Sequence, residues 1–178
     1  MLSTLITSKT RIKLLMRFFI NSKSSSYLRN LENEFSESTN SIRQELNRFE
    51  KAGFLDSYSA GNKKMFKANT NHPLYTDIRN LMLKHIGFDQ IIDKVANRLG
   101  ELNMVYVVGD FAKGIDNKII DLIFIGDNLD KEYLLRLVEK AEKLISRKIR
   151  YIIYNIKDFK EYSVDLKESE TLLLWKEK

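Results

Sequence analysis

The chain has 178 residues, enough for one ordinary domain or two small ones. Hydrophobic residues make up 43% and charged residues 30%, the profile of a folded globular protein rather than a disordered one. With no cysteine, disulfides, thiolate zinc sites and cysteine nucleophiles are excluded, and two histidines cannot build a multi-histidine metal centre. Basic residues scattered through the N-terminal apolar positions exclude a signal peptide, and no later apolar run is long enough for a membrane helix. We therefore expect a cytoplasmic protein without a membrane partner.

The formal net charge of +6 is distributed unevenly along the chain. From Met1 to Pro73, 12 basic residues oppose 6 acidic ones, whereas from Leu74 to Lys178 the count is 18 against 18. All of the excess positive charge therefore lies in the first two-fifths of the sequence. This asymmetry favours a nucleic-acid-binding module joined to a neutral part. The alternative is a basic surface that has no partner.

The basic part begins with a predicted helix over residues 8–21, which Ser8 is placed to cap. Its apolar residues recur at the spacing of a one-faced helix, at Ile12, Leu15, Met16 and Phe19. The polar segment from Ser24 to Tyr27 fits a short strand or an extended link. A second helix is predicted from about Leu28 to Phe35.

A third helix is predicted to begin after Ser38, its N-cap, and to run to Ala52. Gly53 then provides a left-handed C-terminal residue. The buried face of this helix is predicted to hold Ile42, Leu46 and Phe49. Advancing by 100° per residue from Ile42 places amides and a cation on the opposite, outward face of the helix. These residues are Asn40, Gln44, Asn47 and Lys51, flanked by Arg43 and Arg48. Asn and Gln suit adenine edges, and Arg suits guanine or phosphate.

Two strand-like runs follow, residues 54–59 and 63–67, around a Gly-Asn turn that predicts a hairpin. Helix, short strand, helix, helix and basic hairpin is the order of a winged helix-turn-helix domain. In that fold the third helix enters the major groove and the hairpin lies along the DNA backbone. Taken singly, each piece could instead be a solvated helix face or a solubilising turn.

Three stretches of the chain carry a resemblance to a known family: KTRIKLLMRFF, YLRNLENEFSESTNSIRQELNRFEKAGFL and GNKKMFKANTNHPLY. Together they resemble the ArsR-like winged-helix transcriptional regulators. More narrowly, they resemble a bacterial and archaeal group in which this domain is fused to a small nucleotidyltransferase-like domain. The run from Arg43 to Gly53 and the Gly-Asn-Lys-Lys wing are the most specific parts of the resemblance.

Double-stranded DNA is therefore the expected partner of residues 1–73. The residues expected to face bases are Thr39, Asn40, Arg43, Gln44 and Asn47. Those expected on phosphates are Arg48, Lys63 and Lys64, with Tyr27 and Arg29 also reaching the backbone. If about six cationic contacts neutralise phosphates, the log–log dependence of affinity on salt should have a slope near −5.

Residues 74–100 read as a helical connector. Pro73 disfavours helical geometry at His72, and amphipathic patterns then predict helices over residues 75–86 and 88–99, separated by Gly87. Two such helices exceed what a linker needs. They fit a homodimer, which would present two recognition helices to two half-sites, or intramolecular packing alone.

Residues 101–178 predict an α/β domain of about four strands. Apolar runs at residues 104–108 and 119–125 read as strands, the first covered on both faces. A helix is expected from about Asp130 to Ser146, a strand at 150–154, a short helix at 157–162 and a final strand at 172–175. The overall fold class is thus α+β with two domains and a helical connector.

This second domain is similar to the minimal nucleotidyltransferase fold. That fold's signature is Gly-Ser with a further glycine, then Asp-x-Asp on the next strand, and a third carboxylate from a later strand. The glycines let the backbone approach a triphosphate, and the carboxylates hold magnesium. Gly109 and Gly114 match the pattern. Asp110 stands at the serine position, however, only Asp121 remains of the Asp-x-Asp pair, and residues 150–154 offer no third carboxylate.

We therefore expect a transcriptional regulator whose nucleotidyltransferase-like domain is not an enzyme and binds no metal or cofactor. That domain would instead sense a small-molecule effector or dock a protein. The alternative is an active magnesium-dependent nucleotidyltransferase that is targeted by its winged helix. A different metal cluster of Asp110, Asp116 and Asp121 would need the loop to fold these residues together, and nothing in their spacing requires it.

Overall fold

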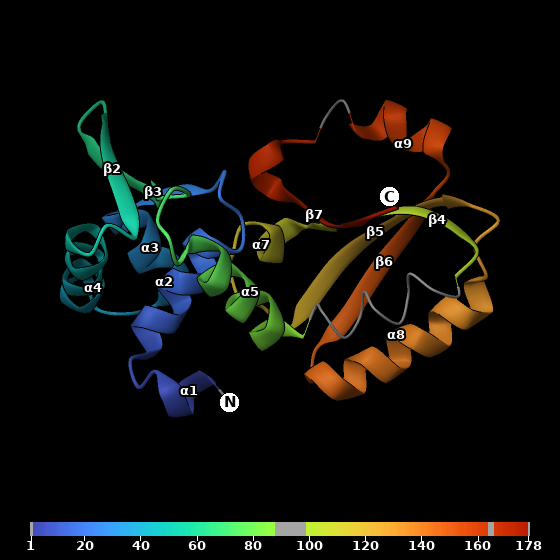
Figure 1. Cartoon of the computed structure of the whole chain (residues 1–178), viewed down its shortest axis with the longest axis horizontal. Helices are drawn as coiled ribbons and strands as arrows, with labels where there is room; N and C mark the ends of the chain where they lie inside the picture. The colour runs from blue at the N-terminus through green and yellow to red at the C-terminus, as the bar shows by residue number, and fades with distance from the viewer. Residues whose placement is uncertain (1, 88–98, 164–165, 178) are drawn as a thin grey trace. The chain divides into compact units, whose positions relative to one another are not determined.

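The computed structural model describes residues 2–87, 99–163 and 166–177 and shows an α+β protein with two β-sheets (Figure 1). Contacts within the chain divide it into two compact units. Their bounds are Met1–His85 with Gly114–Asp116, and Ile86–Lys113 with Asn117–Lys178. In the part of the chain that is described, no helix is long and apolar enough to cross a membrane.

The first unit contains every element predicted between residues 8 and 68, in the predicted order. Its helices and strands are α1 (Leu2–Leu5), α2 (Lys9–Phe19), β1 (Ser25–Tyr27), α3 (Leu28–Phe35), α4 (Thr39–Lys51), β2 (Leu55–Ala60), β3 (Lys63–Ala68) and α5 (Tyr75–Ile86).

Side-chain caps and glycines fix the ends of these elements. The Ser8 hydroxyl accepts a hydrogen bond from the Arg11 amide at 3.2 Å and begins α2. The Ser38 hydroxyl accepts from the Ser41 amide at 3.2 Å and begins α4. After α4, Gly53 has a φ of 75°, a left-handed conformation in which a side chain would be strained.

Helix α2 is buried on more sides than its sequence pattern predicts. Leu14 and Phe18, which lie outside the predicted apolar face, are completely buried, whereas Ile12 within that face is only half-buried. The reason is that α2 contacts α1, α4 and β3, so neighbours surround it. The prediction of a one-faced helix was therefore wrong.

The first sheet has the strand order β1-β3-β2, and both pairings are antiparallel. Strand β3 is central, with Met65 opposite Tyr27 on one side and Tyr58 on the other. Helix α5 follows, and its first residue, Tyr75, packs against Phe19 of α2 with ring centroids 5.7 Å apart. Contacts thus group most of α5 with the first unit. The helix predicted over residues 88–99 lies outside the described residues except at its end.

The second unit carries the four strands and the helices predicted for it, each within a few residues of its expected bounds. Its elements are β4 (Glu101–Val108), α7 (Gly109–Ala112), β5 (Ile119–Asp127), α8 (Lys131–Ile145), β6 (Lys148–Tyr154), α9 (Ile156–Tyr162), the 3₁₀ helix η2 (Glu168–Glu170) and β7 (Thr171–Lys176).

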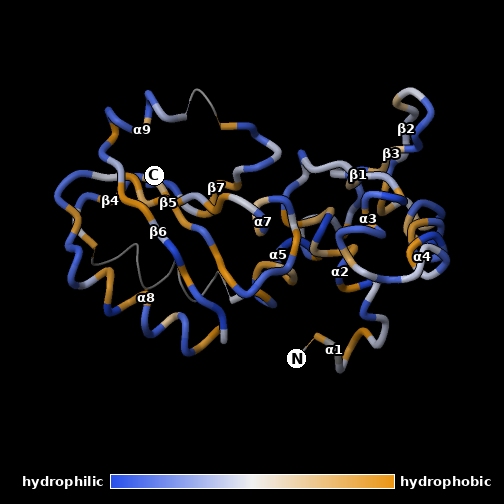
Figure 2. Tube along the Cα trace, turned by 180° about the vertical axis from the view of Figure 1, so that it is seen from behind, coloured by the Kyte–Doolittle hydropathy of each residue, from blue (hydrophilic) through white to orange (hydrophobic). Residues whose placement is uncertain are grey.

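The second sheet has the order β6-β5-β4-β7. Strands β5 and β6 are parallel and joined through α8, whereas β4 is antiparallel to both β5 and β7. Helices α8 and α9 lie on opposite faces of the sheet, and hydrophobic residues recur along α8 between hydrophilic ones (Figures 1 and 2). Phe159 of α9 packs on Ile123 and Ile125 of the central strand β5, which is buried on both faces.

Strand β4 is less covered than its apolar sequence predicts. Val105 and Val107 are buried, but Met104, Tyr106 and Val108 on the other face are only half-buried beside Phe159. The reason is that α9 has seven residues, too few to cover that face completely.

Candidate nucleic-acid interface

Helix α4 presents polar side chains to solvent along its length, as its sequence pattern predicts. Ile42, Leu46 and Phe49 are buried, and Asn40, Arg43, Gln44, Asn47, Arg48 and Lys51 are exposed. The buried residues recur every three or four positions, so the exposed side chains share the outward side of the helix.

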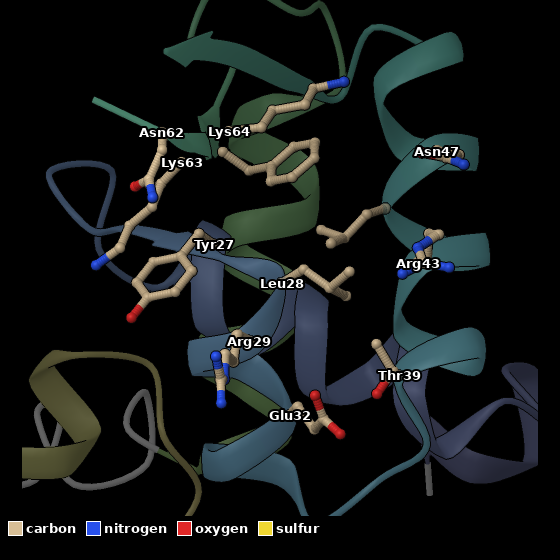
Figure 3. Close-up of a pocket in the computed structure, with 12 residues that line it drawn as sticks. Tyr27, Leu28, Arg29, Glu32, Thr39, Arg43, Asn47, Asn62, Lys63 and Lys64 are labelled. Atoms are coloured by element: carbon tan, nitrogen blue, oxygen red, sulfur yellow. The ribbon is translucent and has the colours of Figure 1, made fainter. Parts of the chain in front are cut away.

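A groove of about 620 Å³ lies beside this helix, between α4, the start of α3 and the β2–β3 hairpin (Figure 3). Leu28, Leu46 and Phe66 supply its apolar lining. The other residues that line it are Tyr27, Arg29, Glu32, Thr39, Arg43, Asn47, Asn62, Lys63 and Lys64.

The groove brings together most of the residues predicted to contact DNA, although they come from four elements. Those that line it are Tyr27, Arg29, Thr39, Arg43, Asn47, Lys63 and Lys64. Asn40, Gln44 and Arg48 do not line it; they are exposed elsewhere on α4. By helical geometry, Asn40 and Gln44 lie farther round the outward face, and Arg48 lies on the flank opposite the groove.

Three cations of the groove have no carboxylate partner among the described residues: Arg29, Arg43 and Lys63. Four of the six carboxylates of residues 1–73 are paired with other cations, such as Glu34 with the buried Arg17 at 2.8 Å. The groove lining therefore keeps the positive charge of Arg29, Arg43 and Lys63, together with the carboxylate of Glu32, for which no ion pair is found among the described residues.

Glu45 is a buried carboxylate that connects α4 to the start of α2. Its oxygens accept hydrogen bonds from Arg11 Nε at 3.0 Å, Arg11 Nη2 at 3.1 Å and Ser8 Oγ at 3.2 Å. Arg48 Nη1 also donates to it at 3.2 Å. Burial raises the pKa of Glu45, but hydrogen bonds and charge from Arg11, with Ser8 and Arg48, outweigh burial and hold the pKa below its ordinary value.

Two adjacent lysines of the hairpin have different environments. Lys64 Nζ lies 2.7 Å from Glu50 Oε2 of α4, and the other oxygen of Glu50 accepts from Ser57 Oγ at 2.5 Å. The hydrogen bonds from Lys64 and Ser57 lower the pKa of Glu50. Lys63 Nζ instead lies 4.3 Å from the centre of the Tyr27 ring, a cation–π contact.

Two of the residues at the positions compared above with the nucleotidyltransferase signature, Asp121 and Asp110, have polar side-chain partners. Arg150 of β6 binds both oxygens of Asp121, Nε to Oδ1 at 2.7 Å and Nη2 to Oδ2 at 3.0 Å. This hydrogen bonding raises the pKa of Arg150. Asp110 accepts a hydrogen bond from Asn117 Nδ2 at 2.8 Å. Gly109 and Gly114 both have positive φ, of 70° and 77°.

No three His, Asp or Glu side chains among the described residues gather into a group that could hold a metal ion. Asp110, Asp116 and Asp121, considered above as a possible cluster, are all described and form no such group. Asp121 accepts hydrogen bonds from Arg150, and Asp110 accepts one from Asn117.

Sequence reasoning did not single out Glu45, Glu50, Ser57, Glu32 or Asn62 as parts of the interface. Helical periodicity places Glu50 on the groove side of α4, about 80° from Ile42, which is a usable signal. The partners of Glu45 and Glu50 lie on other elements, however, and pairing between elements requires the tertiary fold.

The sequence matches no protein-family model, and no curated protein is a significant match. Solved structures with partial similarity include the toxin–antitoxin MntA–HpeT, at 15% identity and a TM-score of 0.40 over 52% of this chain and 75% of that one. Reduced HlyU from Vibrio cholerae is similar at 11% identity and a TM-score of 0.37 over 47% and 82%. A mutant of MarR from E. coli complexed with operator DNA is similar at 15% identity and 0.37 over 81% and 79%. At such low identities and TM-scores, none of these likenesses assigns a function to this chain.

Proposed function

We propose that this chain is a DNA-binding transcriptional regulator whose helix α4 reads base edges in the major groove while the β2–β3 hairpin contacts phosphates. The observation that carries the proposal is the groove lined by Arg29, Arg43 and Lys63, three cations for which the described part of the chain offers no carboxylate partner. Asn47 on α4 adds an amide that can bind adenine edges.

The distribution of charge supports duplex DNA as the ligand. Phosphates along DNA attract clustered cations, and Arg29, Arg43 and Lys63 come from three different elements around one groove. A merely solubilising surface would not need three cations from separate elements to line one groove. Residues 1–73 are thus our proposed DNA-binding domain, residues 74–100 the connector and residues 101–178 the second domain.

We further propose that the second domain is not catalytic and serves to sense an effector or to dock a protein. The bidentate pair between Asp121 and Arg150 supports this proposal, because a guanidinium already satisfies the carboxylate that a magnesium ion would need. This pair also weighs against the alternative of an active magnesium-dependent nucleotidyltransferase.

Fluorescence anisotropy with a labelled duplex of mixed sequence, measured over a series of salt concentrations, tests DNA binding by the full chain. The wild type should bind with a log–log slope near −5, and the Arg29→Ala/Lys63→Ala variant should reduce the magnitude of that slope by about 1.8. The matched control is Lys131→Ala/Lys140→Ala, which removes two exposed charges from α8 and should leave the slope unchanged. A flat salt dependence of the wild type, or equal effects of the two variants, would refute the proposal.

A further inference from the structure

Lys63 and Lys64 are neighbours in sequence but lie on opposite faces of the β2–β3 hairpin. Side chains alternate between the faces of a strand, and residues directly opposite each other on paired strands share a face. Lys64 lies opposite Ser59, and Phe66 lies opposite Ser57, so these four share the face turned towards α4. Figure 3 shows the two lysine amines pointing in different directions, that of Lys63 beside Tyr27.

Lys64 is already engaged within the protein. Its ammonium contacts Glu50 at 2.7 Å and lies 5.1 Å from the centre of the Phe66 ring, and Phe66 is buried. Ser57 donates to the same carboxylate, so Glu50 joins α4 to both strands of the hairpin. Lys63, in contrast, has no carboxylate partner among the described residues.

We propose that Glu50 is a positioning residue that holds the hairpin against α4 through Lys64 and Ser57, and that Lys63 rather than Lys64 supplies the hairpin's phosphate contact. This inference rests on the proposed DNA-binding function. It differs from the expectation from sequence, in which Lys63 and Lys64 both contact phosphates.

The charge of Glu50 makes the proposal testable, because its two possible effects on DNA affinity have opposite signs. A carboxylate beside a phosphate-binding surface repels DNA, so removing its charge should strengthen binding if Glu50 does nothing else. If Glu50 instead fixes the hairpin, removing its charge frees the hairpin and binding should weaken, since ordering it then costs entropy on association.

The experiment compares single variants of the full chain by anisotropy on the same labelled duplex over a salt series. Lys63→Ala should lower the magnitude of the log–log slope by about 0.9, and Lys64→Ala should leave the slope unchanged. Glu50→Gln should weaken binding about threefold. The matched control is Asp56→Asn, which removes an exposed carboxylate from the other face of the same hairpin and should strengthen binding or leave it unaltered.

The double variant Glu50→Gln/Lys64→Ala adds a readout that a generally destabilised unit would not reproduce. If Glu50 and Lys64 position the hairpin through their mutual ion pair, the double variant should bind DNA no more weakly than whichever single variant binds DNA more weakly. The proposal is overturned if Lys64→Ala lowers the slope as much as Lys63→Ala does, or if Glu50→Gln strengthens binding. If the wild type itself shows no salt-dependent binding, the proposed DNA-binding function fails, which is a separate outcome.

Discussion

At the residue scale, one buried carboxylate sets the position of helix α4 relative to helix α2. Glu45 lies within the interface between α2 and α4, where Ser8, Arg11 and Arg48 donate hydrogen bonds to it. A buried carboxylate without such partners would destabilise the fold, so the network stabilises this packing only while it is complete. Arg48, which we expected to contact phosphate, belongs to this network and is still largely exposed.

Replacing Glu45 with Gln should therefore lower the free energy of unfolding at neutral pH by about 1–3 kcal/mol. Because the folded-state pKa of Glu45 lies below its ordinary value of 4.5, its ionisation stabilises the protein above that pH. The stabilisation is lost as pH falls through the lowered folded-state pKa, so the difference between wild type and variant should shrink in acid. Urea unfolding at neutral and acidic pH measures this difference, and a difference that does not change with pH would contradict the assignment.

The pair between Asp121 and Arg150 leads to a prediction about nucleotides. Magnesium with a nucleoside triphosphate should not raise the melting temperature of the full chain, because the only carboxylate left at the Asp-x-Asp position already has a bidentate cationic partner. A bound ligand at 100 times its dissociation constant would add about 2.7 kcal/mol, which thermal denaturation detects easily. A rise in the wild type that is lost in Asp121→Asn would contradict the prediction that Asp121 is not available to a magnesium–triphosphate complex.

At the scale of elements, the N-terminal cap of α4 stabilises the first turn of the helix, which carries residues of the candidate interface. Ser38 caps α4 directly before Thr39 and Asn40, two residues that we expect to face bases. Ser38→Ala should destabilise the first unit by about 1 kcal/mol, weaken DNA binding and speed hydrogen exchange in the first turn of α4. The matched control is Asp130→Ala, which removes the cap of α8, where Asp130 Oδ1 accepts from the Tyr133 amide at 2.8 Å. It should cost a similar amount without changing DNA affinity, and equal losses of affinity would show that the cap acts only through general stability.

The elements themselves were largely predictable from sequence because their signals are local. Periodicity, the caps at Ser8 and Ser38 and the glycine at position 53 act within a few residues, and the structure places α2, α4 and the hairpin where these signals indicate. The predictions that were wrong concerned burial, as for Ile12, Leu14 and Phe18 of α2. Burial depends on how many neighbours pack around a helix, and that is a property of the tertiary fold.

The sequence predicted which residues of the candidate site are exposed, but not which of them form ion pairs with residues of other elements. The outward positions of Arg43 and Asn47 follow from helical geometry alone. The pairing of Lys64 with Glu50, and of Asp121 with Arg150, joins residues on different elements. Sequence spacing carries no information about such pairs, so it could not distinguish Lys64 from Lys63.

At the scale of the whole molecule, residues 1–73 carry all of the excess positive charge. We propose that the protein is a homodimer, in which two copies of this part bind one DNA duplex. A homodimer would present two copies of α4 to two half-sites about one helical turn of DNA apart. Sedimentation velocity should give the mass of a dimer, and duplexes with two half-sites at that spacing should bind more tightly than duplexes with one. A monomer that binds both kinds of duplex equally would contradict this prediction.

The pairing of β1 also has a consequence for how the first unit folds. Within its sheet, β1 pairs only with β3, so α3, α4, β2 and the turn of the hairpin all lie in the loop of chain that this pairing closes. Closing a long loop costs chain entropy before its contacts form, and non-local pairings of this kind slow folding. Tyr27 reaches Lys63 only when β1 has joined the sheet. The groove should therefore be among the last features of the unit to form, after the helices that flank it.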